Sequence, residues 1–497
     1  MKSRLLFVAL AATALAALAG CGGGSSGADV ASLAPPGVPV FVEGNLRPEG
    51  DLKANVNAIA KQVAGVDDLG EFVAEELESA ATGEGESLDF EKEVEPWLGE
   101  HGGVFFEQLE GSDFSGTGIL VESTDTEATQ EFIDKHDEAT EGRKVGMVGD
   151  FLVIAENQKV FKEVEDASDG ESLGDEDTFS KAISAASDGS IADIFVDVGK
   201  LIEQGGGQID PTARQILRNA GIDPSEATAV ASIVPGSEQI AVELSSDLAG
   251  EEAPTGDASS LLGELPGSAF AGFAVTGFGK QLEGALDSLD AEGIPGTVPP
   301  HQLRKGLKQL GIDLEGFAGS LQDAAVFATG ANRSSLGGAL VLSTKGSEAT
   351  KAIGNIGLLL RHVHVAGVTA LNGKYSGFSV HSDELGDKPL VVMAKEGRVA
   401  IGYGVAPTVA GLTSGSGAGK TLSDDPAYSD AVASLGNTPI GGFADGPGAL
   451  HLADALIPSS EEGFEKAKKY LKSIRFLALG SASQGELATA KLIIGLK

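Results

Sequence analysis

Two long series of similar segments run through the chain in the same order, and this repeat constrains the fold more than any other feature. GTGILVESTDTEAT at 116–129 matches GGALVLSTKGSEAT at 337–350, and SLGDEDTFSKAI at 172–183 matches TLSDDPAYSDAV at 421–432. The other three pairs of segments begin at Pro35 and Leu265, at Asp89 and Asp313, and at Ser190 and Pro439. Five matches in the same order indicate a duplicated domain, with an insertion in the second copy.

Within one copy, strand patterns alternate with helix patterns. VPVFVEGNL at 38–46 is rich in β-branched and aromatic residues, which predicts a strand. LKANVNAIAKQVAG at 52–65 has apolar residues at three- and four-residue steps, which predicts a helix. Turn residues at Gly149 and Pro235 separate pairs of apolar runs and predict hairpins. We therefore expect an α+β fold with two tandem homologous domains, each a largely antiparallel β-sheet with interleaved helices.

The join between the copies falls near DLAGEEAPTGDASS at 247–260, which has the composition of a linker. We expect the first repeat at 31–247, the linker at 248–262 and the second repeat at 263–497.

Negative charge is concentrated in the first half of the chain. The formal net charge is −38; residues 251–497 carry 25 acidic and 20 basic side chains, and the first 250 residues carry 48 and 15. Such a surface argues against nucleic acid as a partner, because phosphates require Lys and Arg. It also argues against a protein that lies flat on anionic lipid. A solvated surface explains the charge; weak binding of divalent cations is the alternative, without EF-hand spacing to support it.

The first twenty residues have the layout of an export signal. Lys2 and Arg4 precede an uncharged apolar run from Leu5 to Leu18, which is too short to span a bilayer. The next residues, Leu18-Ala19-Gly20-Cys21, resemble the bacterial lipoprotein box. That resemblance implies cleavage after residue 20 and a diacylglyceryl group on the sulfur of Cys21. The Gly/Ser composition that follows predicts a flexible tether over 21–30. The alternative is an ordinary secretory signal in which the cysteine is incidental.

The chain also resembles an uncharacterised family of secreted actinobacterial and cyanobacterial lipoproteins, known only as a domain of unknown function. The similarity depends on the lipoprotein box, on Trp97-Leu98-Gly99 before a strand, and on Ser123-Thr124 at a strand end that leads into a helix. The second copy has Ser320-Leu321-Gln322 near the place of the tryptophan. The resemblance implies an exported, membrane-tethered protein and brings no established activity or site residue.

Three motifs suggest chemistry, and each has a simpler explanation. SGSGAGKT at 414–421 lacks the first glycine of a phosphate-binding loop and follows a helical pattern, so a surface loop is expected. His362 and His364 would share one face of a strand and could bind zinc, with His381 as a further ligand; a polar strand face or a helix end is the alternative. Asp197 and Asp445 follow apolar strands in matching places, which predicts helix caps rather than a general base.

Taken together, these patterns favour a non-enzymatic lipoprotein of the cell envelope that binds a protein, a glycan or a small ligand. We expect it on the outer face of the cell membrane, or of an outer membrane, with no catalytic residue, metal or cofactor. Trp97 is expected to be a packing anchor. The alternatives are a hydrolase of envelope polymers that uses two carboxylates, and an acidic cation-binding or spacer protein.

Overall fold

The computed structural model describes residues 30–63, 65–67, 70, 89–110, 113–136, 142–204, 227–247, 257–292, 301–371, 376–395, 397–414, 419–457, 462–484 and 487–497. The chain forms two compact units. Unit 1 comprises residues 1–253 with 483–492 and 496–497, and unit 2 comprises 254–482 with 493–495. Residues 483–492, which the sequence division counts in the second repeat, therefore make their contacts in unit 1. No described helix is both long enough and apolar enough to cross a membrane.

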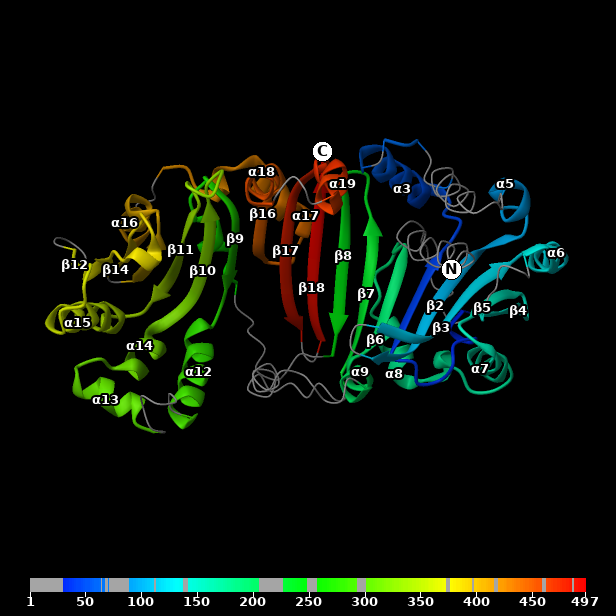
Figure 1. Ribbon diagram of the computed structural model, residues 1–497, viewed down its shortest axis with the longest axis horizontal. Helices are drawn as coiled ribbons and strands as arrows, with labels where there is room; N and C mark the ends of the chain where they lie inside the picture. The colour runs from blue at the N-terminus through cyan, green and yellow to red at the C-terminus, as the bar shows by residue number, and fades with distance from the viewer. Residues whose placement is uncertain are drawn as a thin grey trace. The chain divides into compact units, whose positions relative to one another are not determined.

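Unit 1 is built on an antiparallel sheet whose strands lie in the order β4–β5–β3–β2–β1–β6–β7–β8, with the C-terminal strand β18 paired to β8 (Figure 1). Lys491 of β18 forms an ion pair with Glu243 of β8 at 2.6 Å. The strands are β1 (Val40–Asn45), β2 (Leu98–Glu110), β3 (Asp113–Ser123), β4 (Lys144–Val148), β5 (Phe151–Ala155), β6 (Ala192–Asp197), β7 (Thr228–Pro235), β8 (Gln239–Ser246) and β18 (Leu487–Leu496).

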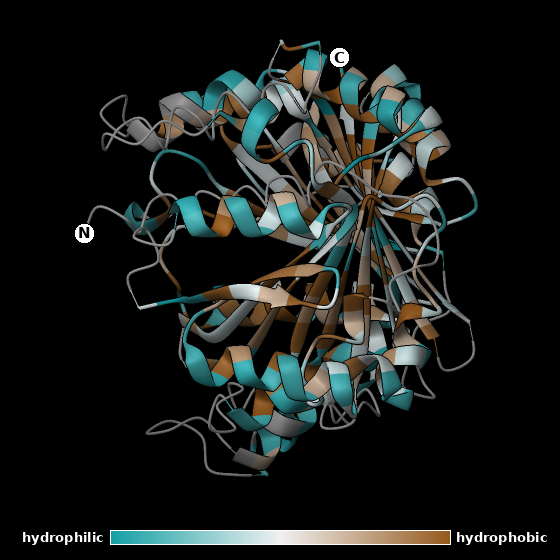
Figure 2. Cartoon of the chain, turned by 90° about the vertical axis from the view of Figure 1, so that its right-hand side faces the viewer, coloured by the Kyte–Doolittle hydropathy of each residue, from teal (hydrophilic) through white to brown (hydrophobic). Residues whose placement is uncertain are grey.

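Helices cover both faces of the sheet in unit 1. Phe41, Phe105 and Phe195 lie on face A, where α7, α8 and the turn at 30–34 enclose a buried cluster. Val42, Val104 and Ile119 lie on face B, under α3, α5 and α6. Figure 2 shows brown strands inside and teal on the outer surfaces of the helices, the pattern of amphipathic helices on a core. The helices are α3 (Gly50–Val63), α5 (Phe90–Glu93), α6 (Thr126–His136), α7 (Gln158–Asp169), α8 (Asp177–Ile183) and α9 (Val198–Gln204).

Unit 2 has an antiparallel sheet in the order β12–β13–β14–β15–β11–β10–β9–β16–β17. Face A, with Phe327 and Phe443, lies under α11, α16 and α17. The strands are β9 (Ala269–Val275), β10 (Leu321–Thr329), β11 (Gly337–Thr344), β12 (Val368–Ala370), β13 (Ser376–Val380), β14 (Leu390–Lys395), β15 (Arg398–Tyr403), β16 (Ile440–Asp445) and β17 (Ile474–Gln484).

On face B of unit 2, α12, α14 and α15 cover a buried cluster that includes Leu321, Leu342 and Val399. Figure 1 shows α12, α13 and α14 grouped at one end of β9 and β10. The helices are α11 (Ser259–Gly263), α12 (Phe278–Glu292), α13 (Leu303–Gln309), α14 (Leu314–Ser320), α15 (Glu348–His362), α16 (Ala406–Ser414), α17 (Pro426–Leu435), α18 (Gly446–Leu456) and α19 (Glu462–Leu471).

The strand pairings of the two units have the same register. Phe41 pairs with both Phe105 and Phe195, and Gly272 pairs with both Phe327 and Phe443. The next strands continue the correspondence, because Phe105 pairs with Gly118 and Phe327 pairs with Ala339. Each position in one ladder therefore has an equivalent in the other. Unit 2 differs by the β12–β13 pair, which lies after α15.

Most of the local predictions are confirmed. The sheets are antiparallel with interleaved helices, as expected for an α+β fold. β4 and β5 form a hairpin in which Val148 pairs with Phe151, and Gly149 adopts a φ of 59° that favours glycine. β7 and β8 form the hairpin predicted around Pro235. Helix α6 begins at Thr126 and is capped by Asp125, whose Oδ1 accepts hydrogen bonds from Glu127 N and Ala128 N.

Candidate binding surface

The predicted lipid site, Cys21, lies outside the described residues, as do the signal sequence and most of the tether. The two aspartates in matching positions cap helices, as predicted. Asp197 Oδ1 accepts a hydrogen bond from Lys200 N at 2.8 Å, and Asp445 Oδ2 accepts one from Gly448 N at 2.7 Å. Each carboxylate is therefore committed to the first turn of a helix, where it also complements the helix dipole.

The glycine-rich segment at 414–421 follows helix α16 rather than a strand, and residues 415–418 of it lie outside the described residues. Thr421 N donates a hydrogen bond to Asp424 Oδ2 at 2.9 Å and begins a short 3₁₀ turn (Leu422–Asp424). Ser172 and Asp175 form the same capping box in unit 1. A helix before the segment and an acidic cap after it do not match a phosphate-binding loop, which requires a preceding strand.

Of the two expectations for the histidine pair, the helix end is confirmed and the strand is wrong. His362 is the last residue of helix α15, and His364 lies beyond its end with a φ of 54°. The apolar residues Ala349, Ile353, Ile356 and Leu360 recur at three- and four-residue steps and form the buried side of α15, so the helical period determines the structure. Among the described parts of the chain, no group of three His, Cys, Asp or Glu side chains is placed to hold a metal ion.

Trp97 is a packing anchor, as predicted. Its side chain is buried on face B of unit 1 and packs against Phe132, with 5.4 Å between the ring centroids. The indole Nε1 donates a hydrogen bond to Glu93 O at 2.6 Å, which satisfies its only polar group. The ring is therefore enclosed in the core and presents no platform for a ligand.

Face A of unit 1 contains a buried carboxylate pair. Glu43 and Asp193 are directly opposed on β1 and β6, and Glu43 is only 9% exposed. Asp193 accepts hydrogen bonds from Ser190 and Ser232, whereas Glu43 Oε2 has no partner among the described residues. Burial, together with the charge of Asp193, raises the pKa of Glu43 to about 8. The pair lies on the covered face, so it does not form the open two-carboxylate cleft that a polymer hydrolase would need.

Face B of unit 2 carries a row of large apolar side chains that solvent reaches. Val326 pairs with Phe273 on one side and with Leu340 on the other, and their side chains point to the same face. Phe273 is 44% exposed and Val326 is 47% exposed. The row, which we call the wall, comprises Ile401, Leu340, Val326, Phe273 and Leu479, and Gly442 lies between the last two.

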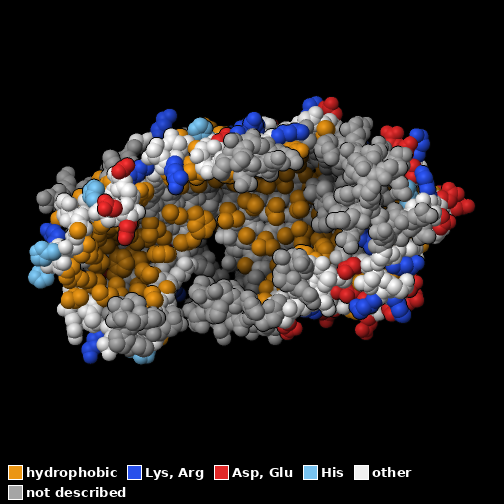
Figure 3. All heavy atoms as spheres, viewed as in Figure 1, with side chains coloured by type: hydrophobic (Ala, Val, Ile, Leu, Met, Phe, Trp, Pro, Cys, Tyr) orange, Lys and Arg blue, Asp and Glu red, His pale blue; other side chains and the backbone are white. Residues whose placement is uncertain are grey.

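The next row on the same face contains small side chains. Ala328 pairs with Gly338 and with Ala271, and Ala271 pairs with Ala444. All four residues are partly exposed. These four residues, which we call the floor, lie beside the wall, so that the two rows form a trough across the strands. Figure 3 shows apolar side chains gathered in a hollowed patch over β9, β10 and β11.

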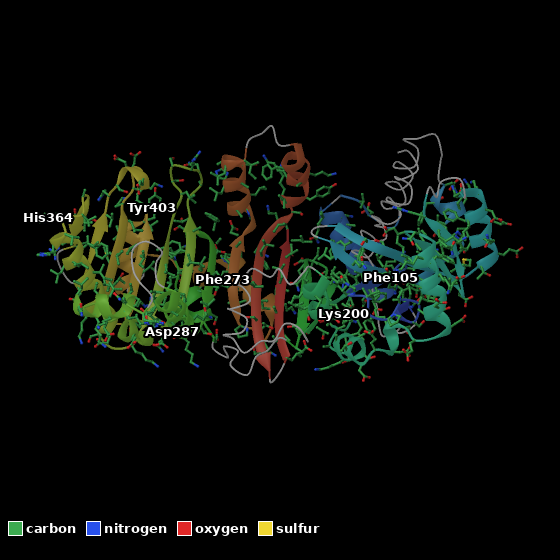
Figure 4. All side chains as sticks on the ribbon, turned by 60° about the horizontal axis from the view of Figure 1, so that its bottom comes forward. Phe105, Lys200, Phe273, Asp287, His364 and Tyr403 are labelled. Atoms are coloured by element: carbon green, nitrogen blue, oxygen red, sulfur yellow. The ribbon has the colours of Figure 1, made fainter. Side chains whose placement is uncertain are left out.

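The ends of the floor carry larger side chains. Tyr403, which pairs with Gly338, donates a hydrogen bond from its hydroxyl to Leu385 O at 2.6 Å. Lys388 Nζ lies 5.9 Å from the centre of the Tyr403 ring and donates a hydrogen bond to Leu336 O at 2.5 Å. At the other end, Leu477 pairs with Ala444. Figure 4 labels Phe273 and Tyr403, which lie on β9 and β15.

The trough is open because α12 packs away from it. Arg304 of α13 forms ion pairs with Asp287 of α12 and Glu315 of α14, at 2.5 and 3.2 Å. Phe278 and Leu282 of α12 pack on the buried cluster of face B, which does not include Phe273 or Val326. Within the part of the chain that the structure describes, Val326, Phe273 and Leu479 therefore lack the helix cover that buries the rest of the face, whereas Leu340 and Ile401 pack against the buried cluster. Figure 4 labels Asp287, which takes part in this arrangement.

The same positions are filled and covered in unit 1. Val104 and Val42, the equivalents of Val326 and Phe273, are 1% and 7% exposed, in one buried cluster with Val56 of α3. Hydrogen bonds from Asn55 to Pro235 O and from Gln62 to Ser237 O hold α3 beside the β7–β8 hairpin. The floor positions of unit 1 hold larger residues throughout: Thr117, Phe106, Val40 and Val196 in place of Gly338, Ala328, Ala271 and Ala444.

Sequence reasoning missed the trough, although one signal was visible. The matched segments contain Val104-Phe105-Phe106 in unit 1 and Val326-Phe327-Ala328 in unit 2. That comparison shows the loss of one large side chain, but the other three losses lie on different strands. Only the sheet brings the four positions into one row.

The sequence model of one protein family, described as a protein of unknown function (DUF3352), matches residues 73–494. No curated protein and no solved structure matches the chain.

Proposed function

The chain belongs to the DUF3352 family of proteins of unknown function, and from that premise we propose that it is a lipid-anchored, duplicated protein of the cell envelope that binds an apolar ligand. Its binding element is the trough on unit 2. The proposal assigns no chemical step to the protein.

The duplication is supported by the sequence matches and by the shared register of the strands. In each unit a central glycine or phenylalanine, Gly272 or Phe41, pairs with a phenylalanine on either side. Independent domains that happened to share a fold class would have no reason to keep the same residue types at the same ladder positions. A duplicated domain also provides a reason for divergence, because one copy can keep the closed structure while the other acquires a site.

The observation that carries the binding role is the exposed wall. Large apolar side chains in the middle of a sheet are normally buried, since each gains about 1.5–3 kcal/mol from leaving water. Contiguous apolar patches on a protein surface mark binding sites. Phe273 and Val326 are both nearly half exposed, while their equivalents in unit 1 are buried.

The anchor is supported by the sequence alone. Cys21 is the only cysteine in the chain and follows Leu18-Ala19-Gly20. Attachment of two or three acyl chains there would hold the protein at the membrane durably, because a single chain gives only marginal binding. Labelling of cells with a radioactive fatty acid tests this step. Label is expected on the native chain and not on Cys21→Ala; equal labelling of both would contradict the anchor.

A photo-reactive phenylalanine analogue tests the binding role in living cells. We expect the analogue at Phe273 to cross-link to a bound molecule. The matched control places it at Val432, an exposed residue of α17 on the other side of the sheet, where no cross-link is expected. A chain that cross-links to nothing from Phe273, or equally from both positions, would contradict a binding site in the trough.

A further inference from the structure

We propose that the trough holds one acyl chain of a membrane glycerolipid, an inference that rests on the proposed function and names its ligand class. The wall and floor supply a slot of apolar side chains on a sheet whose backbone groups are already paired. The following observations lead to this ligand class.

The chemistry of the trough excludes polar ligands. The wall and floor contain Val, Leu, Ile, Phe, Ala and Gly, with no charged side chain and no side-chain hydrogen-bonding group. The hydroxyl of Tyr403 at the end of the floor is engaged by Leu385 O. A glycan or a polar peptide would lose hydrogen bonds to water there without replacement, at a cost of several kcal/mol. An alkyl chain has no hydrogen bonds to lose.

The dimensions suit a long, thin ligand. From Val326 on β10 to Leu479 on β17 the exposed part of the wall crosses four strands, or about 14 Å at about 4.8 Å per strand spacing. The floor is one residue wide. A slot that is long and narrow fits an unbranched chain better than a fused-ring or globular ligand.

The comparison with unit 1 shows how the slot arises. Four floor positions that hold Thr, Phe, Val and Val in unit 1 hold Gly, Ala, Ala and Ala in unit 2. Each change removes side-chain volume from the same row. Because side chains are small at every position of the row, the space beside the wall is continuous. Isolated cavities at single positions would instead destabilise the fold.

Two further features favour a bilayer lipid as the source. The proposed anchor at Cys21 would keep the trough close to a membrane, where acyl chains are abundant. Helix α18, which packs against β9 and β16, is mostly apolar apart from His451 and Asp454 but has no buried residue, and its Leu456 is 46% exposed. It therefore places a second incompletely covered apolar surface next to the floor.

Native mass spectrometry of the full mature chain tests the proposal. The protein carries Cys21→Ser, so that its own anchor does not contribute lipid. It is incubated with vesicles of palmitoyl-oleoyl phosphatidylglycerol and then separated from them. We expect one lipid per chain. Lysophospholipids of increasing chain length should bind more tightly by up to about fourfold per methylene, levelling off once the chain fills the slot.

Two variants with a matched control identify the site. Ala328→Phe restores the residue that unit 1 carries at Phe106, and Val326→Asp places a charge in the wall; each is expected to reduce lipid binding at least tenfold. Val432→Asp makes the same substitution at a residue that is 40% exposed on α17, and should change binding less than twofold. If Ala328→Phe fails to fold, Val326→Asp still decides, because Val326 is already exposed.

Each outcome has a definite meaning. Unchanged lipid binding by folded Val326→Asp would overturn the site. Binding of palmitic acid without binding of phosphatidylglycerol would overturn the membrane source. A protein, rather than a lipid, cross-linked from Phe273 would overturn the acyl ligand while leaving the binding function intact. An absence of any cross-link from Phe273 would contradict both the acyl ligand and the binding function.

Discussion

The two units share one pattern of strand pairing, but the same sheet positions are covered in unit 1 and exposed in unit 2. In unit 1, Val42 and Val104 lie beneath α3, and Phe106 fills the neighbouring row. In unit 2 the equivalent Phe273 and Val326 face solvent, and Ala328 leaves the row empty. The backbone register is shared, so the difference comes from side-chain size and from where one helix packs. A sheet can thus be changed from a closed core into an open surface without any change in its topology.

The largest contrast should come from one substitution made at two equivalent positions. Val104→Asp places a charge at a site that is 1% exposed, so we expect a loss of at least about 5 kcal/mol of unfolding free energy and failure of unit 1 to fold. Val326→Asp, at a site 47% exposed, should change stability by no more than about 0.5 kcal/mol. Urea unfolding followed by circular dichroism measures both. Similar losses at the two positions would show that the wall of unit 2 is covered.

A second contrast concerns charge on face A. Glu43 of unit 1 is equivalent to Ala274 of unit 2, because each lies two residues after the central strand position, Phe41 or Gly272. The pKa of Glu43 is about 8 when folded and near 4.5 when unfolded. The folded protein therefore keeps a proton that the unfolded chain releases, so stability falls as the pH rises from about 4.5 to about 8.

Glu43→Gln should remove this dependence. We expect the variant to match the native chain near pH 4.5 and to exceed its stability at pH 9 by as much as about 4 kcal/mol. Thermal unfolding across pH 4.5–9 measures the effect, with Glu238→Gln, on the exposed β7–β8 turn, as the control. A parallel pH dependence in the native chain and Glu43→Gln would show that Glu43 is ionised in the fold.

The smallest effect should come from the ion pairs that hold α12 away from the trough. Arg304→Gln removes the ion pairs to Asp287 and Glu315, of which Asp287 is largely exposed, so we expect a loss of about 1 kcal/mol. Hydrogen exchange should accelerate in α12 and stay unchanged in α3 of unit 1. Equal acceleration in both helices, or in neither, would show that these ion pairs do not position α12.

The sequence predicts the parts of this fold that depend on neighbours in the chain. The β4–β5 hairpin follows from Gly149 between apolar runs, and helix α3 follows from its three- and four-residue apolar spacing. The helix caps at Asp197 and Asp445 are local as well. At His362 the short His-x-His pattern suggested a strand, but the longer apolar period before it forms a helix, so the helix-end alternative is the one confirmed.

The site could not be predicted in the same way, because its residues meet only in three dimensions. Gly338, Ala328, Ala271 and Ala444 lie on four strands spread over more than 170 residues of the chain, and each is unremarkable alone. Their alignment depends on how β11, β10, β9 and β16 pair with one another, which no local pattern in the sequence specifies. The repeat supplied the comparison, but the register was needed to show that the four small residues form one row.

Titration with 1-N-phenylnaphthylamine, an apolar dye that fluoresces when it leaves water, tests most directly whether the trough of unit 2 is an open binding site. The full mature chain carrying Cys21→Ser should bind one dye molecule per chain in the trough. The double variant Ala271→Val, Ala328→Phe, which copies two floor residues of unit 1, should lose that binding while unfolding at the same temperature or higher. Retention of the same stoichiometry and affinity by the folded double variant would contradict the account.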